Sequence, residues 1–300
     1  MYEKLVDEII AGKRLTRDDD VSFLIQGELE ALKQGANRIR EALCGNRVDL
    51  CTIINGKAGR CSENCKFCAQ SAHHHTGAKE YSFMDADEII EECRKNEKNG
   101  AHRFSIVTAG RSLSAKDFDL AVHAYDRMRK ECPGIDLCAS HGLLTEEQFR
   151  ILKANGVSMY HENIETSRRY FPMICTTHTF DEKIECIKAA QRAGLQVCSG
   201  GIIGMGENWD DRLDMAFTLA ELESLSEEDI LRSIVLFRFI NPTADVRLAA
   251  GRNLMSECGR EAFFSGANAT LTGDMLTTYC NNTEQDKKML VENGFDIGRR

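Results

Sequence analysis

Three cysteines lie close together in one short stretch of the sequence, Cys61-Ser-Glu-Asn-Cys65-Lys-Phe-Cys68. Gaps of three and then two residues allow a single loop to wrap one small iron–sulfur cluster. Three thiolates are one fewer than the four that usually hold a [4Fe–4S] cluster, so one iron would stay open to a substrate or cofactor. A structural zinc site usually needs a second pair of ligands at regular spacing, and none is obvious in the sequence. The spacing therefore predicts a [4Fe–4S] cluster at this loop.

The cysteine content of the whole chain supports a role for thiols as metal ligands. The chain has 13 cysteines, an odd number that cannot be fully paired within one chain. The first 20 residues, MYEKLVDEIIAGKRLTRDDD, carry charges throughout and lack the apolar core of a secretory signal. We therefore expect a cytoplasmic protein with reduced thiols, some of which bind metal.

The segments around the cysteine loop alternate between two patterns. From Val48 onward, short apolar runs alternate at least five times with stretches of helical period. This alternation predicts βαβ units with a parallel sheet, either open or closed into a barrel. The cysteine loop follows the first predicted strand at its C-terminal end, where the active sites of barrels lie. We expect a helical N-terminal extension over residues 1–47 and an α/β barrel domain over residues 48–300.

Composition excludes two classes of partner. The formal net charge of −9 means that the chain has no overall excess of basic residues that would favour binding to nucleic acid. No apolar run approaches the roughly 20 residues of a membrane-spanning helix, so no membrane association is expected. With 42% hydrophobic residues the chain has enough apolar material for a globular core.

The cysteine motif after a first strand, with an aromatic residue before its third cysteine, resembles the radical S-adenosylmethionine (SAM) enzymes. The stretch from Val48 to Gly273 resembles, more narrowly, the biotin synthase family. The matching blocks are CKFCAQS, YHENIETS, ICTTHT, VCSGGIIGMGE, VRLAAGR and FFSGANAT. The resemblance implies a (β/α)8 TIM-type barrel that uses a [4Fe–4S] cluster and SAM to insert sulfur into desthiobiotin. It further implies an auxiliary [2Fe–2S] cluster, an electron donor such as flavodoxin or ferredoxin, and a homodimer.

The resemblance also suggests ligands for the auxiliary cluster. Cys138, Cys198 and Arg247 lie in blocks where the family places three of them. A fourth family position, normally a cysteine, holds Ser105, whereas Cys51 stands on the first predicted strand where the family has a serine. We expect Cys51 to replace the missing ligand and the cluster to be a [2Fe–2S] cluster or a variant. The alternative is that Cys51 is a core residue, a common role for buried cysteine.

Four residues match positions that contact SAM in the family. Asn163 and Glu165 would bind the ribose, since a carboxylate can accept hydrogen bonds from both ribose hydroxyls. Lys183 would neutralise the methionine carboxylate, unless it is a solvated helix residue. Ile202 would present its backbone to the adenine.

One family segment is missing. Between Glu223 and Ser224, roughly 20 residues that carry a strand and its loop in the family have no counterpart. We therefore expect seven strands in place of eight. Two alternatives to biotin synthase follow: a radical SAM enzyme that acts on another small molecule, or a non-catalytic cluster-binding protein disabled by the missing strand.

Overall fold

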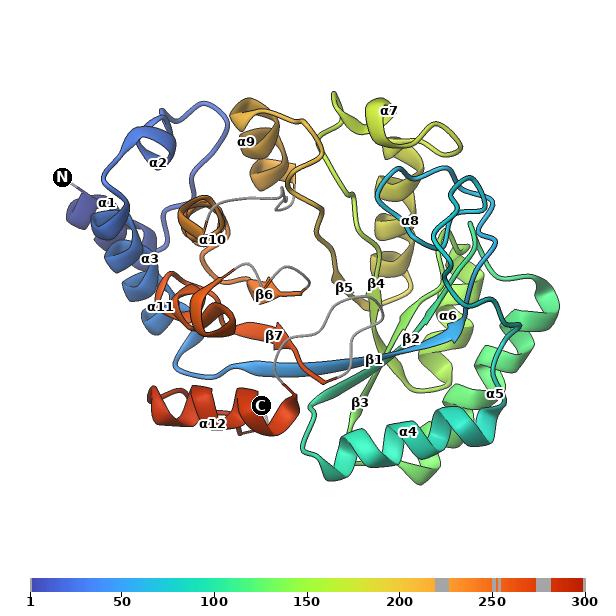
Figure 1. The fold of residues 1–300 in the computed structure, drawn as a ribbon. Helices are drawn as coiled ribbons and strands as arrows, with labels where there is room; N and C mark the ends of the chain where they lie inside the picture. The colour runs from blue at the N-terminus through green and yellow to red at the C-terminus, as the bar shows by residue number, and fades with distance from the viewer. Residues whose placement is uncertain (1, 219–226, 250–251, 253–254, 274–281, 299–300) are drawn as a thin grey trace. The chain divides into compact units, whose positions relative to one another are not determined.

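The computed structural model of the chain describes residues 2–218, 227–249, 252, 255–273 and 282–298 (Figure 1). Seven strands are present in this part of the chain: β1 (Asp49–Lys57), β2 (Arg103–Thr108), β3 (Asp136–Ser140), β4 (Val157–His161), β5 (Gln196–Cys198), β6 (Arg247–Leu248) and β7 (Ala269–Leu271). The helices are α1 (Tyr2–Ile10), α2 (Phe23–Gln26), α3 (Leu29–Cys44), α4 (Ala86–Lys98), α5 (Ala115–Glu131), α6 (Glu146–Ala154), α7 (Phe171–Ile174), α8 (Phe180–Arg192), α9 (Trp209–Thr218), α10 (Glu227–Ile240), the 3-10 helix η2 (Ser256–Gly259), α11 (Arg260–Phe264) and α12 (Thr283–Glu292). The alternation of strand and helix predicted from Val48 is confirmed.

The chain folds into two compact units. Unit 2 is one continuous segment, residues 51–200, whereas unit 1 combines residues 1–50 with residues 201–300. The sequence pattern suggests a different division, between a helical extension that ends at residue 47 and a barrel domain that begins at residue 48. That division stays a prediction.

Unit 2 is a layer of parallel strands covered by helices. Strands β1 to β5 pair in chain order, and α4, α5, α6 and α8 lie outside the curved strands in Figure 1. The core of the unit lies between these two layers, where Phe104 and Tyr160 of the strands meet Phe149 of α6. Because the apolar residues of the strands face the helices, polar and sulfur-bearing side chains are left for the opposite face.

Local signals set the helix ends that position the site. Helices α6 and α8 each begin with a capping box, in which Thr145 and Thr179 exchange hydrogen bonds with the third residue of the helix. Gly156, which has a φ of 99°, then reverses the chain between α6 and β4 in a conformation that favours glycine. These elements hold the loops that follow β3 and β4.

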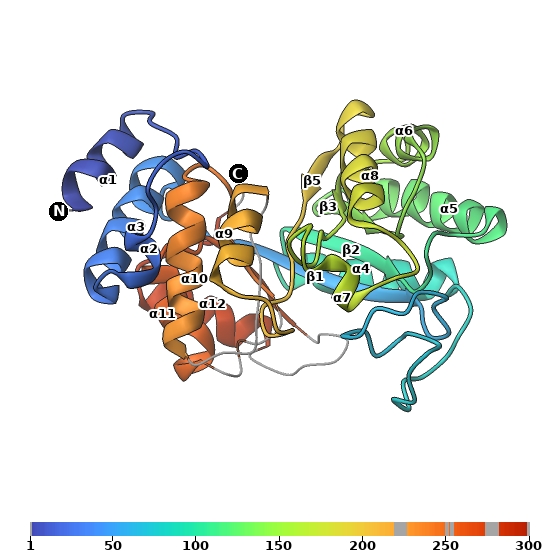
Figure 2. The same ribbon diagram turned by 90° about the horizontal axis from the view of Figure 1, so that it is seen from above.

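Unit 1 is mainly helical, and Figure 2 shows α3 and α10 side by side within it. Gly35 of α3 allows this close approach, because a Cβ there would lie 3.0 Å from the ring of Phe239 and 3.0 Å from Val6. A buried ion pair lies elsewhere in unit 1, where Arg252 Nη2 is 2.7 Å from Asp286 Oδ1. None of the described helices is both long and apolar enough to cross a membrane.

Strand β1 contributes to both units. In unit 1 the N–H of Asp49 donates to the carbonyl of Asn268, and from Cys51 onward β1 pairs with β2 in unit 2. The strand order of the sheet is β5-β4-β3-β2-β1-β7-β6. As far as the chain is described, no strand lies between α9 and α10. The expectation of a TIM-type barrel that lacks one strand is confirmed.

Candidate active site

The loop that carries the cysteine triplet leaves the end of β1 and folds back on itself. The N–H of Cys61 donates to Gln70 O (2.9 Å), and the carbonyl of Cys61 accepts from the N–H of Ala72 (2.9 Å). A tight turn joins the other two cysteines, in which Cys68 N–H donates to Cys65 O (3.1 Å). All three thiols are free and half-buried. Burial raises the pKa of Cys65 and of Cys68, so a bound cation would be needed to favour their thiolates.

The segment between α7 and α8, residues 175–179, holds this loop in place and is called the α7–α8 clamp below. Asn64 exchanges two hydrogen bonds with Thr176, one from its side-chain amide to Oγ1 (2.6 Å) and one from the Thr176 N–H to its Oδ1 (2.9 Å). The N–H of Asn64 also donates to Thr177 Oγ1 (3.1 Å), and Lys66 N–H donates to Ile174 O (2.9 Å). The position of the cysteine loop is therefore fixed by a segment more than 100 residues away in the sequence.

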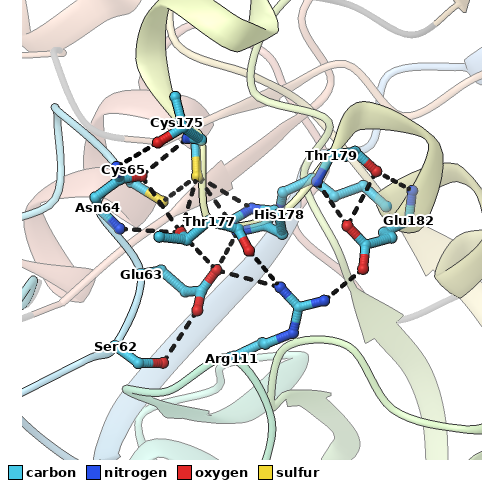
Figure 3. A network of polar contacts seen from close by, with 12 residues as sticks. Ser62, Glu63, Asn64, Cys65, Arg111, Cys175, Thr177, His178, Thr179 and Glu182 are labelled. Atoms are coloured by element: carbon cyan, nitrogen blue, oxygen red, sulfur yellow. Dashed lines mark hydrogen bonds and ion pairs between the residues drawn. The ribbon is translucent and has the colours of Figure 1, made fainter.

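The clamp brings a fourth cysteine and a histidine to the triplet (Figure 3). Cys175 Sγ lies 3.7 Å from Cys65 Sγ and 3.4 Å from His178 Nδ1. The same ring nitrogen makes a short hydrogen bond to Glu63 Oε2, and Arg111 Nη1 approaches that oxygen to 3.5 Å. Burial lowers the pKa of His178, although the Glu63 carboxylate opposes the effect.

Sequence reasoning missed this pair. Cys175 and His178 lie in the block ICTTHT, which supports the resemblance but to which the sequence assigns no ligand. The available signal was a cysteine and a histidine three residues apart, immediately before the capped start of α8.

A buried ion pair lies beside the cysteine loop. Lys183 Nζ of α8 is 2.6 Å from Glu162 Oε1, and both side chains are buried. Burial alone would lower the pKa of Lys183, but the carboxylates of Glu162 and Glu165 raise it well above its usual value. Lys183 also opposes the rise in the pKa of Cys65, so this cation acts on one thiol of the cysteine triplet. Lys183 is therefore not a solvated helix residue.

Glu165 has an unusual conformation and an unusual environment. Its φ is 65°, in the left-handed region that non-glycine residues rarely adopt. Burial raises the pKa of its carboxyl to about 7, although Lys183 acts in the opposite direction. Its Oε2 atom is buried and has no hydrogen-bond partner in the described chain. Asn163, two residues earlier in the same loop, is exposed.

The inner face of strands β1 to β3 carries two of the predicted ligands for the auxiliary cluster. Ile53 is in register with Ser105, and Ser105 is in register with Cys138. Residues in register on neighbouring parallel strands point to the same side of a sheet, and so do residues two apart on one strand. Cys51, two residues before Ile53, therefore shares a face with Ser105 and Cys138. Cys51 and Cys138 are both buried.

The same face continues across β4 and β5. Cys138 is in register with Met159, and Met159 is in register with Gln196. Two residues further along both strands, His161 is in register with Cys198. Burial alone would lower the pKa of His161, but the neighbouring Cys198 and Cys138 raise it to about 10.

The two remaining predicted residues belong to unit 1. Arg247 Nη2 lies 2.9 Å from Asp49 Oδ2, and both side chains are largely buried. Ile202 is half-buried in the segment that follows β5.

Two solved structures share the fold. A methylornithine synthase matches with a TM-score of 0.83 at 19% identity, over 98% of this chain and 97% of that one. A maturase of the [FeFe]-hydrogenase matches with a TM-score of 0.82 at 16% identity, over 97% of this chain and 74% of that one. At these identities the likeness concerns the fold alone.

The cysteine loop after β1 and the parallel sheet define the class of the protein. Residues 57–219 match the model of the radical SAM superfamily, and the chain belongs to that superfamily. Residues 214–296 match the biotin and thiamin synthesis associated domain. The biotin synthase of Alkaliphilus metalliredigens is 59% identical over 98% of this chain and 99% of its own, and that of Clostridium beijerinckii is 58% identical over 98% and 100%. Within the superfamily, the chain belongs to the biotin synthase family.

The alignments also bear on the missing segment. The alignment with the Alkaliphilus relative spans 316 positions, and this chain has 300 residues, so at least 16 positions of the relative have no counterpart. A deletion of the predicted size is consistent with this difference. Its predicted position, between Glu223 and Ser224, lies outside the described residues.

Proposed function

We propose that the chain is a biotin synthase, which inserts sulfur between two saturated carbons of desthiobiotin. The observation that carries the proposal is the clamped cysteine triplet, in a chain 59% identical over nearly its full length to a biotin synthase. When bound, the [4Fe–4S] cluster and SAM supply a 5′-deoxyadenosyl radical that abstracts hydrogen from C–H bonds. The residues of the chain provide binding, orientation and exclusion of water.

Cys61, Cys65 and Cys68 fit the [4Fe–4S] cluster. Their thiols are free, they belong to one tightly hydrogen-bonded loop, and membership of the radical SAM superfamily implies such a cluster with SAM. We assign the cluster to these three residues.

Glu165, Asn163, Lys183 and Ile202 are proposed to hold SAM. Glu165 Oε2 supports this role, because a buried carboxylate oxygen without a hydrogen-bond partner is costly unless a ligand supplies a donor. The ribose hydroxyls would be such donors. Lys183 is held within this site by Glu162, where its charge can face the methionine carboxylate.

The auxiliary cluster is assigned to Cys51, Cys138, Cys198 and Arg247. In an eight-stranded barrel of shear 8, a layer at constant height advances one residue per strand, or two residues from one odd strand to the next. Cys138 on β3 lies two positions further along its strand than the residue that is in register with Cys51 on β1. Cys198 on β5 likewise lies two positions further along its strand than the residue that is in register with Cys138. The three cysteines therefore fit one barrel layer built from odd strands. Ser105 on β2 belongs to the alternate layer, which supports Cys51 in its place.

Several features of the proposal come from family membership only. They are desthiobiotin as substrate, flavodoxin or ferredoxin as electron donor and a homodimeric state. The cytoplasmic location expected from the sequence remains a proposal. The type of the auxiliary cluster, [2Fe–2S] or a variant, is left to spectroscopy of the reconstituted protein.

The test uses the full chain, reconstituted anaerobically with iron and sulfide and then reduced. With SAM and desthiobiotin, we expect 5′-deoxyadenosine, methionine and biotin. Cys65→Ala should release no 5′-deoxyadenosine but retain auxiliary iron, whereas Cys186→Ala, a buried cysteine of α8, should behave as the parent chain. A parent chain with both clusters that forms no 5′-deoxyadenosine would contradict the proposed function. Loss of all iron in a folded Cys65→Ala variant would contradict the assignment of two separate clusters.

A further inference from the structure

Cys175 and His178 lie against the cysteine triplet, yet the proposed function gives neither a role. Both side chains are buried, and they lie in the segment that clamps the cysteine loop. With Cys65 they form a group of three ligand atoms that all lie within 4.8 Å of one another. Two thiols and an imidazole are a ligand set typical of zinc.

The distances match a single metal ion better than a cluster. A tetrahedral zinc ion has bonds of about 2.3 Å to sulfur and 2.0–2.1 Å to nitrogen, which sets its ligand atoms about 3.6–3.8 Å apart. Cys65 Sγ and Cys175 Sγ are 3.7 Å apart, and Cys175 Sγ is 3.9 Å from His178 Nε2. These two separations are therefore close to the distances between ligand atoms in such a tetrahedron.

The histidine is also oriented as a metal ligand. Its Nδ1 is hydrogen-bonded to Glu63 Oε2 and lies 3.4 Å from Cys175 Sγ, which leaves Nε2, 3.9 Å from the same sulfur, as the nitrogen that would bind the ion. A carboxylate that accepts from one ring nitrogen while the other binds metal is the common arrangement around zinc-bound histidine. Glu63 is itself fixed by Thr177 Oγ1 (2.8 Å) and Ser62 Oγ (3.0 Å).

We propose that the cluster-free chain binds one zinc ion through Cys65, Cys175 and His178, with Glu63 as the residue that orients the histidine. The fourth position of the ion is left for water. Because Cys65 belongs to both sets, the zinc ion and the loop cluster exclude each other; this part of the inference rests on the proposed function. Zinc at this site would hold the chain in a state that cannot acquire its [4Fe–4S] cluster.

The test titrates reduced, cluster-free full chain with Zn²⁺ against a competing chelator, without oxygen. Cys175→Ala and His178→Ala should each weaken the tightest zinc binding at least tenfold, and Glu63→Gln should weaken it 10- to 100-fold. Cys186→Ala and Cys61→Ala should leave it unchanged. If Cys61→Ala weakens binding and Cys175→Ala does not, zinc belongs to the triplet and the proposal is wrong. Unchanged affinity in every variant overturns it equally.

Two further measurements guard against misfolding and separate this inference from the proposed function. Co²⁺ bound to Cys175→Ser should show weaker sulfur-to-metal charge-transfer absorption than the parent, and circular dichroism should show both to be folded. In cluster reconstitution, one equivalent of Zn²⁺ should block iron uptake by the triplet in the parent but not in Cys175→Ala. If the parent acquires no cluster even without zinc, the proposed function fails. The zinc site would still stand on the titrations.

Discussion

Replacement of Glu165 by Gln should stabilise the protein while it removes the proposed ribose contact. Burial raises the pKa of this carboxyl from its usual value of 4.5 to about 7. Each pKa unit corresponds to about 1.4 kcal/mol, so ionisation in the folded state costs up to about 3 kcal/mol. Because the residue is partly exposed, we expect the substitution to recover about 2 kcal/mol.

The sign of the pH dependence follows from the raised pKa. Between about pH 4.5 and 7 the folded chain holds this proton more tightly than the unfolded chain does. The free energy of unfolding of the parent therefore falls as the pH rises through this range and levels off above about pH 7. Gln does not ionise, so the advantage of Glu165→Gln should be small near pH 4.5 and reach its full value near pH 8.

The assay is urea unfolding of reduced, cluster-free chain at pH values from 5 to 8. Glu147→Gln on α6 is the matched control, because the side chain of Glu147 is 73% exposed and the change should not alter the pH profile. In the reconstituted protein, Glu165→Gln should lower SAM cleavage at least tenfold. If the free energy of unfolding depends on pH in the same way in the parent and in Glu165→Gln, the proposal that burial raises the pKa of this carboxyl is refuted.

Three further predictions concern the auxiliary cluster, the substrate and the stability of unit 1. Cys51→Ser should lose the auxiliary iron while SAM cleavage persists, and Ser105→Ala should keep both; full auxiliary iron in Cys51→Ser would refute the layer argument. The parent should cleave SAM slowly and couple it weakly to desthiobiotin, because the missing segment is expected, from the resemblance to the family, on the substrate side of the barrel. Insertion of a family-like strand there should raise unfolding temperature and biotin yield together, and one biotin per auxiliary cluster without it would contradict the reasoning. Arg252→Met should destabilise the chain by about 3–5 kcal/mol in urea unfolding, since it leaves the Asp286 carboxylate buried and unpaired; a loss below about 1 kcal/mol would show that water reaches this carboxylate.

Local sequence patterns were sufficient for the strands and for the cysteine loop. Apolar period and helix caps depend on residues near one another in the chain, so β1 to β5 and the helices between them could be predicted. The loss of a strand was also visible, because α9 and α10 follow each other directly in the sequence pattern.

Contacts between distant segments could not be predicted in the same way. Cys175 lies 110 residues after Cys65, and only the fold of the α7–α8 connection brings the two sulfur atoms together. The pairing of Lys183 with Glu162 likewise depends on how α8 packs beside the loop after β4. A charged helix residue gives no sign in the sequence that it is buried, because burial depends on the neighbouring elements.

The order of the two units along the chain bears on how the protein is made. Unit 2 is continuous, and it contains the cysteine triplet, the α7–α8 clamp and the three cysteines of the inner face. Unit 1 needs residues 201–300 as well as the first 50. At about 5–20 residues per second, a ribosome needs roughly 5–20 s to add those last hundred residues. During synthesis, the thiols proposed to bind metal can therefore reach their folded surroundings while two thirds of unit 1 does not yet exist, and a metal ion can bind to them before the chain is complete.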